Sequence, residues 1–447
     1  MAIITTRDLK RIKRSRTELP KLTSAQIKNR GKQRLHTIIK NGAWKGRPCF
    51  LVGGGPSLVG FDWSRLSGEL SIGINRTFEK FDPTILFSMD NRFWKWVEQG
   101  DFGMAARDKF RNYQYGIKLW VNVVGAPYSD DIFTVTCCGD AKWSHSLSDG
   151  VGAGGNSGYA ALNLAYLLGA NPIYLLGYDM HGDLNGKQKW FHNGYPINQG
   201  SGVYIQFLNK FNQIAVPALK NTGVRVINLN SDSALRCFEF GSLNNVEPVS
   251  MPTVVAYYTS KYSKEAEKLK NSLRFWGLRR EIHLIGDQGS WQRNTQYKPV
   301  FLLKMLDACK PHPIVYVDAD ATIESYPDWF ENLDGCTDFS AHLRKKKLGN
   351  VELLSGTIYL ANNQKTRNFL KHWMKVNEQH PDLWDQKNLH TALLEHPKEE
   401  KLKFTEMPSE YCTIFDAMPE AGDSPVITHW QASRRLKHET RHNSDTD

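Results

Sequence analysis

Short apolar runs alternate with longer amphipathic stretches over the first half of the chain. Such runs, bounded by glycine, proline or polar residues, predict buried strands, whereas longer stretches with apolar residues at helical spacing predict helices. Strands are expected over 48–52, 70–74, 84–88, 118–124, 173–177 and 224–229, and helices over 158–169 and 204–221. Strands that alternate with helices predict a mostly parallel sheet covered on both faces.

The same alternation returns after a polar stretch over 241–250, which contains glycine and proline and is typical of a linker. Strands are expected over 253–258, 281–285 and 313–317, and helices over 263–275 and 299–309. A chain of 447 residues is too long for one ordinary core. The pattern therefore predicts an α/β protein with two Rossmann-like parallel-sheet domains, over 46–241 and 251–432. An N-terminal arm over 1–45 and a polar tail over 433–447 flank them.

Charge distinguishes the arm from the domains. Residues 1–48 carry 14 Lys and Arg against two acids, a balance of +12, whereas the whole chain carries +11. The basic character therefore belongs to the arm, and the two domains together are close to neutral. An arm of this kind contacts nucleic acid or another anionic surface, or it is a solvated extension.

Two further features bear on the cellular location. The chain has no run of about 18 apolar residues that would predict a transmembrane segment, and its N-terminus lacks the apolar core of a secretory signal. Its seven cysteines, an odd number without Cys-x-x-Cys spacing, argue against a disulfide framework or a zinc knuckle. The expected location is therefore the reducing cytoplasm.

Two carboxylates follow the strand expected over 313–317. Asp318 and Asp320 lie two residues apart in an extended segment, so their side chains face the same way. Ligands gather at the carboxyl ends of strands in open α/β sheets, and carboxylate oxygens suit Mg²⁺ or Mn²⁺. The spacing predicts a divalent metal site there, although Asp-x-Asp also occurs by chance.

Residues 251–432 resemble GT-A fold glycosyltransferases, because the segments 315–321, 354–362, 384–388 and 429–430 follow in that family's order. The resemblance implies that Asp318, Asp320 and His429 hold the metal, and that Ser355 and Gly356 line the donor-sugar pocket. It places Asp385 and Gln386 at the reacting sugar, Tyr257, Tyr258 and Thr259 at the base, and Lys298 at the donor phosphates. The alternatives are a core aromatic pair at 257–258, a surface lysine at 298 and a packed imidazole at 429. The chain departs from the His-x-x-Gly-x-x-Lys tail of some relatives after His429.

A glycine turn, residues 53–57, follows the first expected strand. Its backbone N–H groups could approach a phosphate at a helix N-terminus, or it could be only a tight turn. With the segments 73–75, 88–90, 155–158 and 173–179, it resembles the Rossmann-type domain of bacterial sialyltransferases, motility accessory factors and hydroxymethylpterin pyrophosphokinases, over residues 46–232.

That second resemblance also implies specific roles. It assigns the nucleotide to Gly53, Gly54, Gly55, Ser57 and Asn75, a donor contact to Ser157, and the general base to His192, with His181 as the competing candidate. Gly54 departs from the asparagine of the sialyltransferase turn. Because the motif also occurs in a phosphoryl-transfer family, it does not decide the chemistry.

The function predicted from both parts is a glycosyltransferase that uses Mn²⁺ or Mg²⁺ and a nucleotide sugar, with a UDP-sugar as the expected donor. The expected acceptor is a glycan, a protein or a modified DNA base such as one in a bacteriophage. One alternative makes the N-terminal domain the main or a second catalyst, by sialyl or diphosphate transfer. The other is a non-catalytic polyanion-binding protein.

Overall fold

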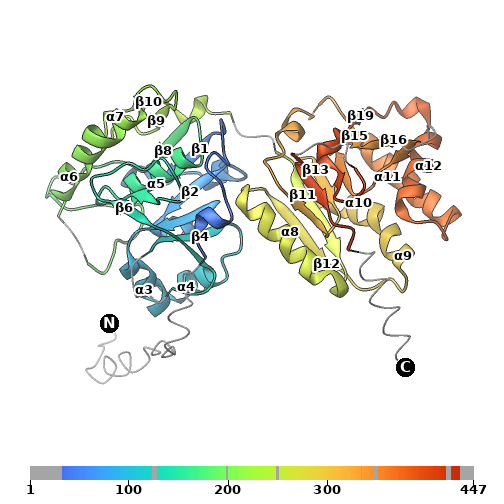
Figure 1. Ribbon diagram of the computed structural model, residues 1–447, viewed down its shortest axis with the longest axis horizontal. Coiled ribbons are helices and arrows are strands. Elements are labelled where there is room, and N and C mark those ends of the chain that lie inside the picture. Colours follow the sequence, from blue (N-terminus) through green and yellow to red (C-terminus); the bar gives the residue numbers. More distant parts are fainter. Residues whose placement is uncertain are drawn as a thin grey trace, which may run out of the picture. The chain divides into compact units, whose positions relative to one another are not determined.

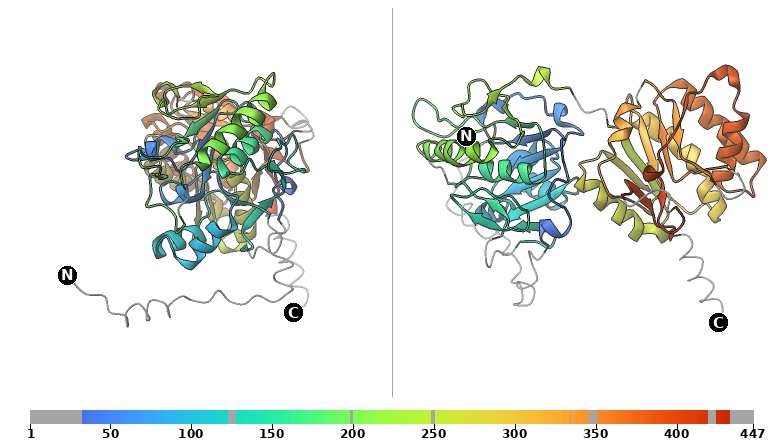
Figure 2. Two further views of the ribbon diagram at one scale, coloured as in Figure 1. Left: turned by 90° about the vertical axis from the view of Figure 1, so that its left-hand side faces the viewer. Right: turned by 45° about the horizontal axis from the view of Figure 1, so that its top comes forward.

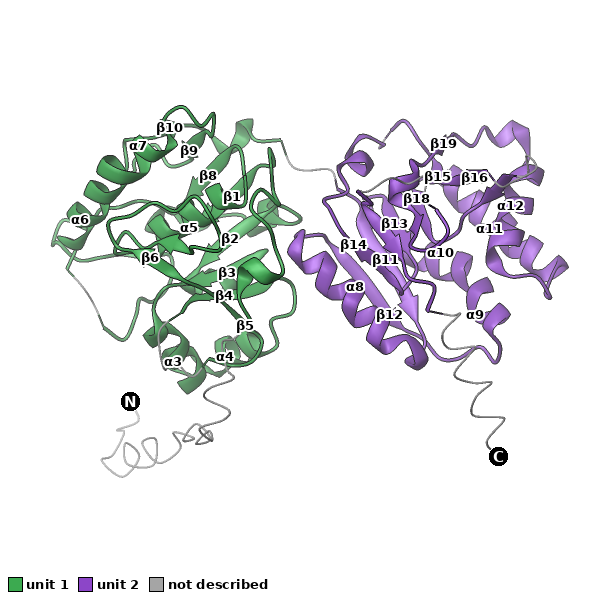
Figure 3. Ribbon diagram, viewed as in Figure 1, with its two compact units in different colours: residues 1–248 green, residues 249–447 purple. Residues whose placement is uncertain are grey.

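The computed structural model describes residues 33–122, 128–197, 200–247, 251–333, 335–345, 351–418 and 424–432. The chain divides into two compact units, Met1–Pro248 and Val249–Asp447 (Figure 3). The division falls inside the polar stretch that was expected to be a linker. Most of the basic arm, residues 1–32, and the expected polar tail, 433–447, lie outside the described residues.

The first unit is built on a parallel eight-stranded sheet with the order β10-β9-β8-β1-β2-β3-β4-β5. Its strands are β1 (Cys49–Val52), β2 (Ser71–Ile74), β3 (Ile85–Ser88), β4 (Ile117–Val121), β5 (Ile132–Val135), β8 (Ile173–Leu176), β9 (Val226–Asn228) and β10 (Glu239–Phe240). The parallel α/β architecture is thus confirmed. Strand β1 pairs with β2 on one side and β8 on the other, so the strand order reverses there and opens a crevice at the carboxyl ends.

The helices of the first unit differ in how deeply they are buried. They are α3 (Asn91–Gln99), α4 (Met104–Arg111), α5 (Ser157–Leu167), α6 (Val203–Lys210) and α7 (Val216–Leu219). Helix α5 contacts β1, β2 and β3 and buries most of its length, because its Ala residues allow close approach to the sheet. Helices α3 and α4 and strand β5 are additions to the elements expected from the sequence.

The helix expected over 204–221 is interrupted by a π-helical segment over Phe211–Ala215. Pro217 has no N–H and its ring crowds the preceding turn, so the regular hydrogen-bond ladder cannot pass through it. The Val216 N–H instead reaches back five residues to the Phe211 carbonyl.

The second unit is built on a mixed six-stranded sheet with the order β12-β11-β13-β18-β15-β19. Its strands are β11 (Thr253–Tyr258), β12 (Arg280–Leu284), β13 (Ile314–Val317), β15 (Phe339–Ala341), β18 (Thr357–Leu360) and β19 (Phe404–Glu406). Strands β12, β11 and β13 run parallel, as expected, but β18 is antiparallel to β13. The chain therefore re-enters the sheet beside the end of β13, where the Asp318 N–H donates to the Gly356 carbonyl at 2.9 Å.

Both faces of the second sheet are covered. Val254 and Ala256 of β11 pack with Leu269 of helix α8 (Ser263–Phe275), whereas the alternate residues Val255 and Tyr257 pack with the other helices. Those helices are α10 (Lys298–Ala308), α11 (Gln364–Gln379) and α12 (Asp385–Glu395). In Figures 1 and 2, α8 lies on one side of the sheet and α11 and α12 lie on the other. No helix in the described ranges has the length and apolar composition needed to cross a membrane.

Trp373 of α11 has no exposed surface, so it supports the second core directly. We expect Trp373→Ala to lower the free energy of unfolding by about 3–5 kcal/mol, because it removes buried apolar area and leaves a cavity. Urea denaturation followed by circular dichroism measures this. Lys371→Ala, at an exposed position of the same helix, is the control and should change stability by less than about 0.5 kcal/mol. Equal midpoints for the two variants would contradict this role of Trp373.

Candidate functional site

A cavity of about 470 Å³ opens at the carboxyl ends of β11 and β13 in the second unit. Its wall includes Tyr257, Tyr258, Thr259, Lys298, Asp318, Asp320, Ser355, Asp385 and Gln386. The tertiary structure therefore brings together nine residues that the sequence had assigned to the donor or the reaction. They come from β11, the start of α10, the segment after β13, the segment before β18, and the start of α12.

Lys298 is the buried centre of this cavity. Its side chain is 2% exposed, and its Nζ atom lies 2.6 Å from Asp385 Oδ2 and 3.1 Å from Asp318 Oδ1. The same ammonium group donates to the Ser355 carbonyl at 2.9 Å. Burial disfavours a charged lysine, but the two carboxylates outweigh burial and raise the pKa of Lys298. Lys298 is thus neither a surface lysine nor a freely available phosphate contact.

The dipole of helix α10 disfavours the positive charge of Lys298. Lys298 occupies the first turn of α10, where the helix dipole favours an anion over a cation. Asp385 starts α12 and is itself almost fully buried. Two helix N-termini are therefore joined through one ion pair in the cavity wall.

Three groups that could hold a metal converge beside Lys298. Asp318, Asp320 and His429 each offer one ligand atom, and these atoms all lie within 4.8 Å of one another. His429 arrives from 109 positions further along the chain than Asp320. It does so because β14 (Ala321–Ile323) pairs antiparallel with β21 (Ile427–His429), which sets His429 opposite Ala321.

The imidazole of His429 is packed and oriented by its neighbours. Its Nε2 lies 2.8 Å from Thr357 Oγ1, while Nδ1 is buried without a hydrogen-bond partner and lies 3.9 Å from Asp320 Oδ1. A Cβ at Gly356 would lie 3.0 Å from the ring, so a glycine there allows the imidazole to approach. Burial opposes a charge on the ring, but the interaction with Asp320 raises the pKa of His429 to about 10.

This donor set fits a divalent cation. Two carboxylates and one imidazole are ligands that Mn²⁺ accepts, and the unpartnered Nδ1 of His429 points to a group that it would bind. The second oxygen of Asp320 accepts the Ala432 N–H at 2.8 Å, which orients the carboxylate. Although burial alone would raise it, the interactions with His429 and Ala432 hold the pKa of Asp320 below its usual value.

The cavity also contains residues that sequence reasoning did not assign. They are Tyr262, Trp291, Asn294, Thr295, Tyr316, Arg344, Glu352, Leu354, Trp384, Ile414 and Gln431, besides Ala319 between the two aspartates. Tyr316 was detectable in principle, since it lies on β13 two residues before Asp318, and its hydroxyl donates to Asp318 Oδ1 at 2.8 Å. Several of the others lie on short elements, namely α9 (Trp291–Gln296), β16 (Leu343–Lys345), β17 (Val351–Leu353) and β20 (Thr413–Ile414). Elements of two to six residues leave little periodic signal in the sequence.

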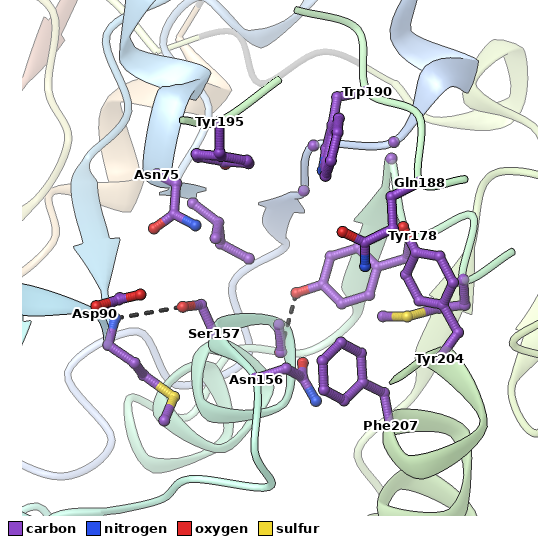
Figure 4. Close-up of a pocket in the computed structure, with 18 of the residues that line it drawn as sticks. Asn75, Asp90, Asn156, Ser157, Tyr178, Gln188, Trp190, Tyr195, Tyr204 and Phe207 are labelled. Carbon is purple, nitrogen blue, oxygen red and sulfur yellow. Dashed lines mark hydrogen bonds between the residues drawn. The ribbon is translucent and has the colours of Figure 1, made fainter. Parts of the chain in front are cut away.

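A second cavity of about 440 Å³ lies in the first unit, at the carboxyl ends of β1, β2, β3 and β8. Figure 4 shows Asn75, Asp90 and Ser157 on one side of it and the rings of Tyr178, Tyr204 and Phe207 on the other. Ser157 begins α5, and its hydroxyl accepts the Met89 N–H at 3.3 Å. The wall thus combines helix starts with aromatic rings.

The glycine turn at the end of β1 forms part of this second wall, but a carboxylate occupies one side of it. The Ser57 N–H and hydroxyl both donate to Asp179, at 3.0 and 2.8 Å. A Cβ at Gly55 would lie 1.8 Å from Asp179 Oδ2, so the glycine permits this approach between the ends of β1 and β8. Gly53, Gly54 and Gly55 line the cavity, whereas Ser57 is turned toward Asp179.

Of the other residues expected at the nucleotide site of the first unit, one lines the cavity and two histidines do not. Asn75 lines the cavity with a left-handed backbone (φ 52°), and its buried Oδ1 has no hydrogen-bond partner. His192 lies behind the cavity wall and stacks on Trp190 with ring centroids 6.0 Å apart. Burial, helped by Arg76, lowers the pKa of His192 to about 3. His181 is exposed, with Nδ1 near the Gly182 carbonyl. Neither histidine lines the described cavity.

Removing the central cation should destabilise the second unit. Lys298→Met leaves Asp385 as a buried carboxylate without its partner, so we expect a loss of about 3–5 kcal/mol in the free energy of unfolding. The double variant Lys298→Met/Asp385→Asn should recover most of that loss, since no buried charge remains uncompensated. Lys304→Met, at an exposed position of the same helix, is the control. Equal stability of the single and double variants by urea denaturation would refute the pairing.

Comparison with known proteins gives partial similarities only. No protein-family model and no curated protein matches the chain. A glycosyltransferase involved in the glycosylation of the major capsid of PBCV-1 aligns with a TM-score of 0.34 and 11% identity, over 42% of this chain and 98% of its own. The glycosyltransferase GlyE of Streptococcus pneumoniae TIGR4 aligns with a TM-score of 0.30 and 15% identity, over 40% of this chain and 54% of its own. The galactosyltransferase LgtC, solved with donor and acceptor sugar analogues, aligns with a TM-score of 0.31 and 10% identity, over 41% of this chain and 94% of its own. All three of these solved structures are glycosyltransferases.

Proposed function

We propose that the second unit transfers a sugar from a nucleotide-sugar donor to a hydroxyl-bearing acceptor, with a divalent cation held by Asp318, Asp320 and His429. The observation that carries the proposal is the convergence of these three groups beside an aromatic-lined cavity whose wall includes Asp318 and Asp320. The order of the motifs in the sequence supports the same function. A UDP-sugar is the proposed donor, and Mn²⁺ or Mg²⁺ the proposed ion.

Some residues of the cavity would bind the donor or the ion, and others orient the side chains that do so. When bound, the ion supplies positive charge that stabilises a departing diphosphate. Tyr257 and Tyr258 end β11 and Thr259 follows it on the cavity wall, where the base of the donor would lie against the two rings. Lys298 holds the carboxylates of Asp318 and Asp385 in place and so positions the metal ligands relative to the start of α12.

Asp385 and Gln386 are the proposed polar contacts of the reacting sugar. Both line the cavity at the first turn of α12, with Ser355 on the wall of the same cavity. The ion pair with Lys298 restrains the Asp385 carboxylate, which favours a hydrogen-bonding role toward sugar hydroxyls. Gln386 follows it on the helix and offers both a donor and an acceptor.

Donor binding should depend on the cation and on Asp320. We expect UDP or a UDP-sugar to raise the melting temperature of the full chain with Mn²⁺ present and little without it, because a bound ion would offset the repulsion between the protein carboxylates and the diphosphate. A stabilisation of about 2.7 kcal/mol is expected when the ligand is at 100 times its Kd. Thermal-shift assays with UDP-, GDP- and CMP-sugars measure this and identify the donor.

Two variants test the assignment of the ion. Asp320→Asn should abolish the Mn²⁺-dependent shift and lower transfer or donor hydrolysis by roughly 100-fold or more. Asp307→Asn, an exposed acid on the same unit, should leave both unchanged. Metal-dependent turnover that survives in Asp320→Asn would sink the proposal.

A second candidate function belongs to the first unit, where we propose a nucleotide site. The start of α5 and the glycine turn border one cavity at the switch point of the sheet, and the α5 N-terminus favours an anion. Because Asp179 occupies the turn, the phosphate would lie nearer Ser157 than Ser57. We further propose that this unit catalyses sialyl or diphosphate transfer, with His192 or His181 as the general base.

The two sites can be separated in the full chain. In an Asp318→Asn/Asp320→Asn background, nucleotide binding that persists without metal reports the first unit. Adding Ser157→Leu should then weaken that binding at least tenfold by filling the cavity at the start of α5, whereas Ser67→Leu, at an exposed position, should not. Isothermal titration with CMP, UDP and ATP measures the difference. Binding that is indifferent to Ser157→Leu would remove the first-unit site.

A further inference from the structure

Two exposed aromatic rings stand together at the rim of the second unit's cavity. Phe415 is 52% exposed and Trp430 is 48% exposed, and the rings stack with centroids 5.5 Å apart and planes inclined by 30°. Neither residue lines the cavity, but their chain neighbours Ile414 and Gln431 do. The pair, which we call the rim platform, therefore lies just outside the cavity wall.

The topology of a small sheet brings the two rings together. Strand β20 (Thr413–Ile414) runs parallel to β21, with Ile414 opposite His429. Phe415 and Trp430 are the first residues after these two strands, and the Phe415 N–H donates to the His429 carbonyl at 3.3 Å. The strand that carries the proposed metal ligand His429 thus also places Trp430, and its neighbour β20 places Phe415.

The platform is also held rigidly to the proposed metal site. The Trp430 N–H donates to the Asp320 carbonyl, and the Ala432 N–H donates to the Asp320 carboxylate. Gln431 adopts a left-handed backbone (φ 52°), which lets the chain contact Asp320 on both sides of it. The indole Nε1 donates to Thr322 Oγ1 at 2.7 Å and so orients the ring. An indole that is fixed at its edge and open on its surface can receive a flat ligand.

The chemistry around the rings favours a neutral sugar over a polyanion. Pyranose rings present an apolar face of C–H groups, which stacks on an exposed aromatic ring, and hydroxyl groups at the edge, which need polar partners. Glu324, which accepts from Thr322 Oγ1, supplies an acidic group next to the platform, because the same Thr322 Oγ1 accepts from the Trp430 indole. A carboxylate accepts hydrogen bonds from hydroxyls but repels phosphates.

We propose that Phe415 and Trp430 form the binding surface for a neutral sugar residue of the acceptor. The inference rests on the proposed glycosyl transfer by the second unit and names its acceptor class as a glycan. The donor occupies the cavity beside Asp318 and Asp320, and the acceptor stacks on the platform at the rim, one residue from His429. An acceptor hydroxyl there approaches the cavity from solvent.

The test uses the full chain with Mn²⁺ and UDP. Saturation-transfer NMR with methyl β-galactoside, lactose, cellobiose and maltose should show contact with at least one of these sugars. Trp430→Ala and Phe415→Ala should each weaken its apparent affinity roughly tenfold, while Trp430→Phe, which keeps a stacking ring, should retain most of it. Leu394→Ala, which removes an exposed apolar side chain from α12, is the control and should change nothing. Circular dichroism confirms that each variant is folded.

The outcomes separate this inference from the proposed function. No Mn²⁺-dependent thermal shift with UDP in the unaltered chain would reject the proposed function itself. If that shift is present, contact with none of the sugars overturns the rim platform as an acceptor site. Equal sugar binding by Trp430→Ala, Trp430→Phe and the unaltered chain overturns it as well. Preferential contact with an oligothymidylate probe would also overturn it, in favour of a nucleic-acid acceptor.

Discussion

The buried ammonium group of Lys298 is the interaction on which the second unit's cavity depends. A charge with 2% exposure is tolerable only because Asp385 and Asp318 lie 2.6 and 3.1 Å away. This one group connects the start of α10, the segment after β13 and the start of α12, all of which contribute to the cavity wall. The two carboxylates offset the free-energy cost of desolvating the ammonium group. The ammonium group in turn holds the Asp318 carboxylate near Asp320 and His429.

The second constraint is the return of the chain to the sheet edge. Strand β21 pairs with β14 although residues 324–426 separate the two strands, and the three residues after Asp320 lie opposite the three residues of β21. This pairing places His429 in the cluster, Gln431 in the cavity wall and Trp430 at the rim. A proposed metal ligand, a wall residue and a binding surface are therefore products of one short antiparallel ladder.

The two units use similar sheet edges differently. In the first, the glycine turn after β1 brings the backbone close to β8, and Asp179 uses the approach to hold Ser57. In the second, Gly356 makes room for an imidazole. Both are close approaches that a Cβ would obstruct, yet the second approach serves the proposed metal cluster directly, whereas the first places a carboxylate where a phosphate was expected. A glycine at a sheet edge thus makes room for a carboxylate in the first unit and for an imidazole in the second.

The sequence by itself determined the strands and helices with a strong apolar signal. Strands β11 and β13 are continuous apolar runs, helix α5 is apolar along most of its length, and helix α8 has one apolar face. The sequence also determined that Asp318 and Asp320 stand at the end of a strand, since that follows from local spacing. The reversed strand β18, the break before Pro217, the burial of Lys298 and the position of His192 behind Trp190 were decided only by the tertiary structure. The physical reason is range: local periodicity reports which face of an element is buried, whereas long-range strand pairing and charge compensation decide which distant side chains meet.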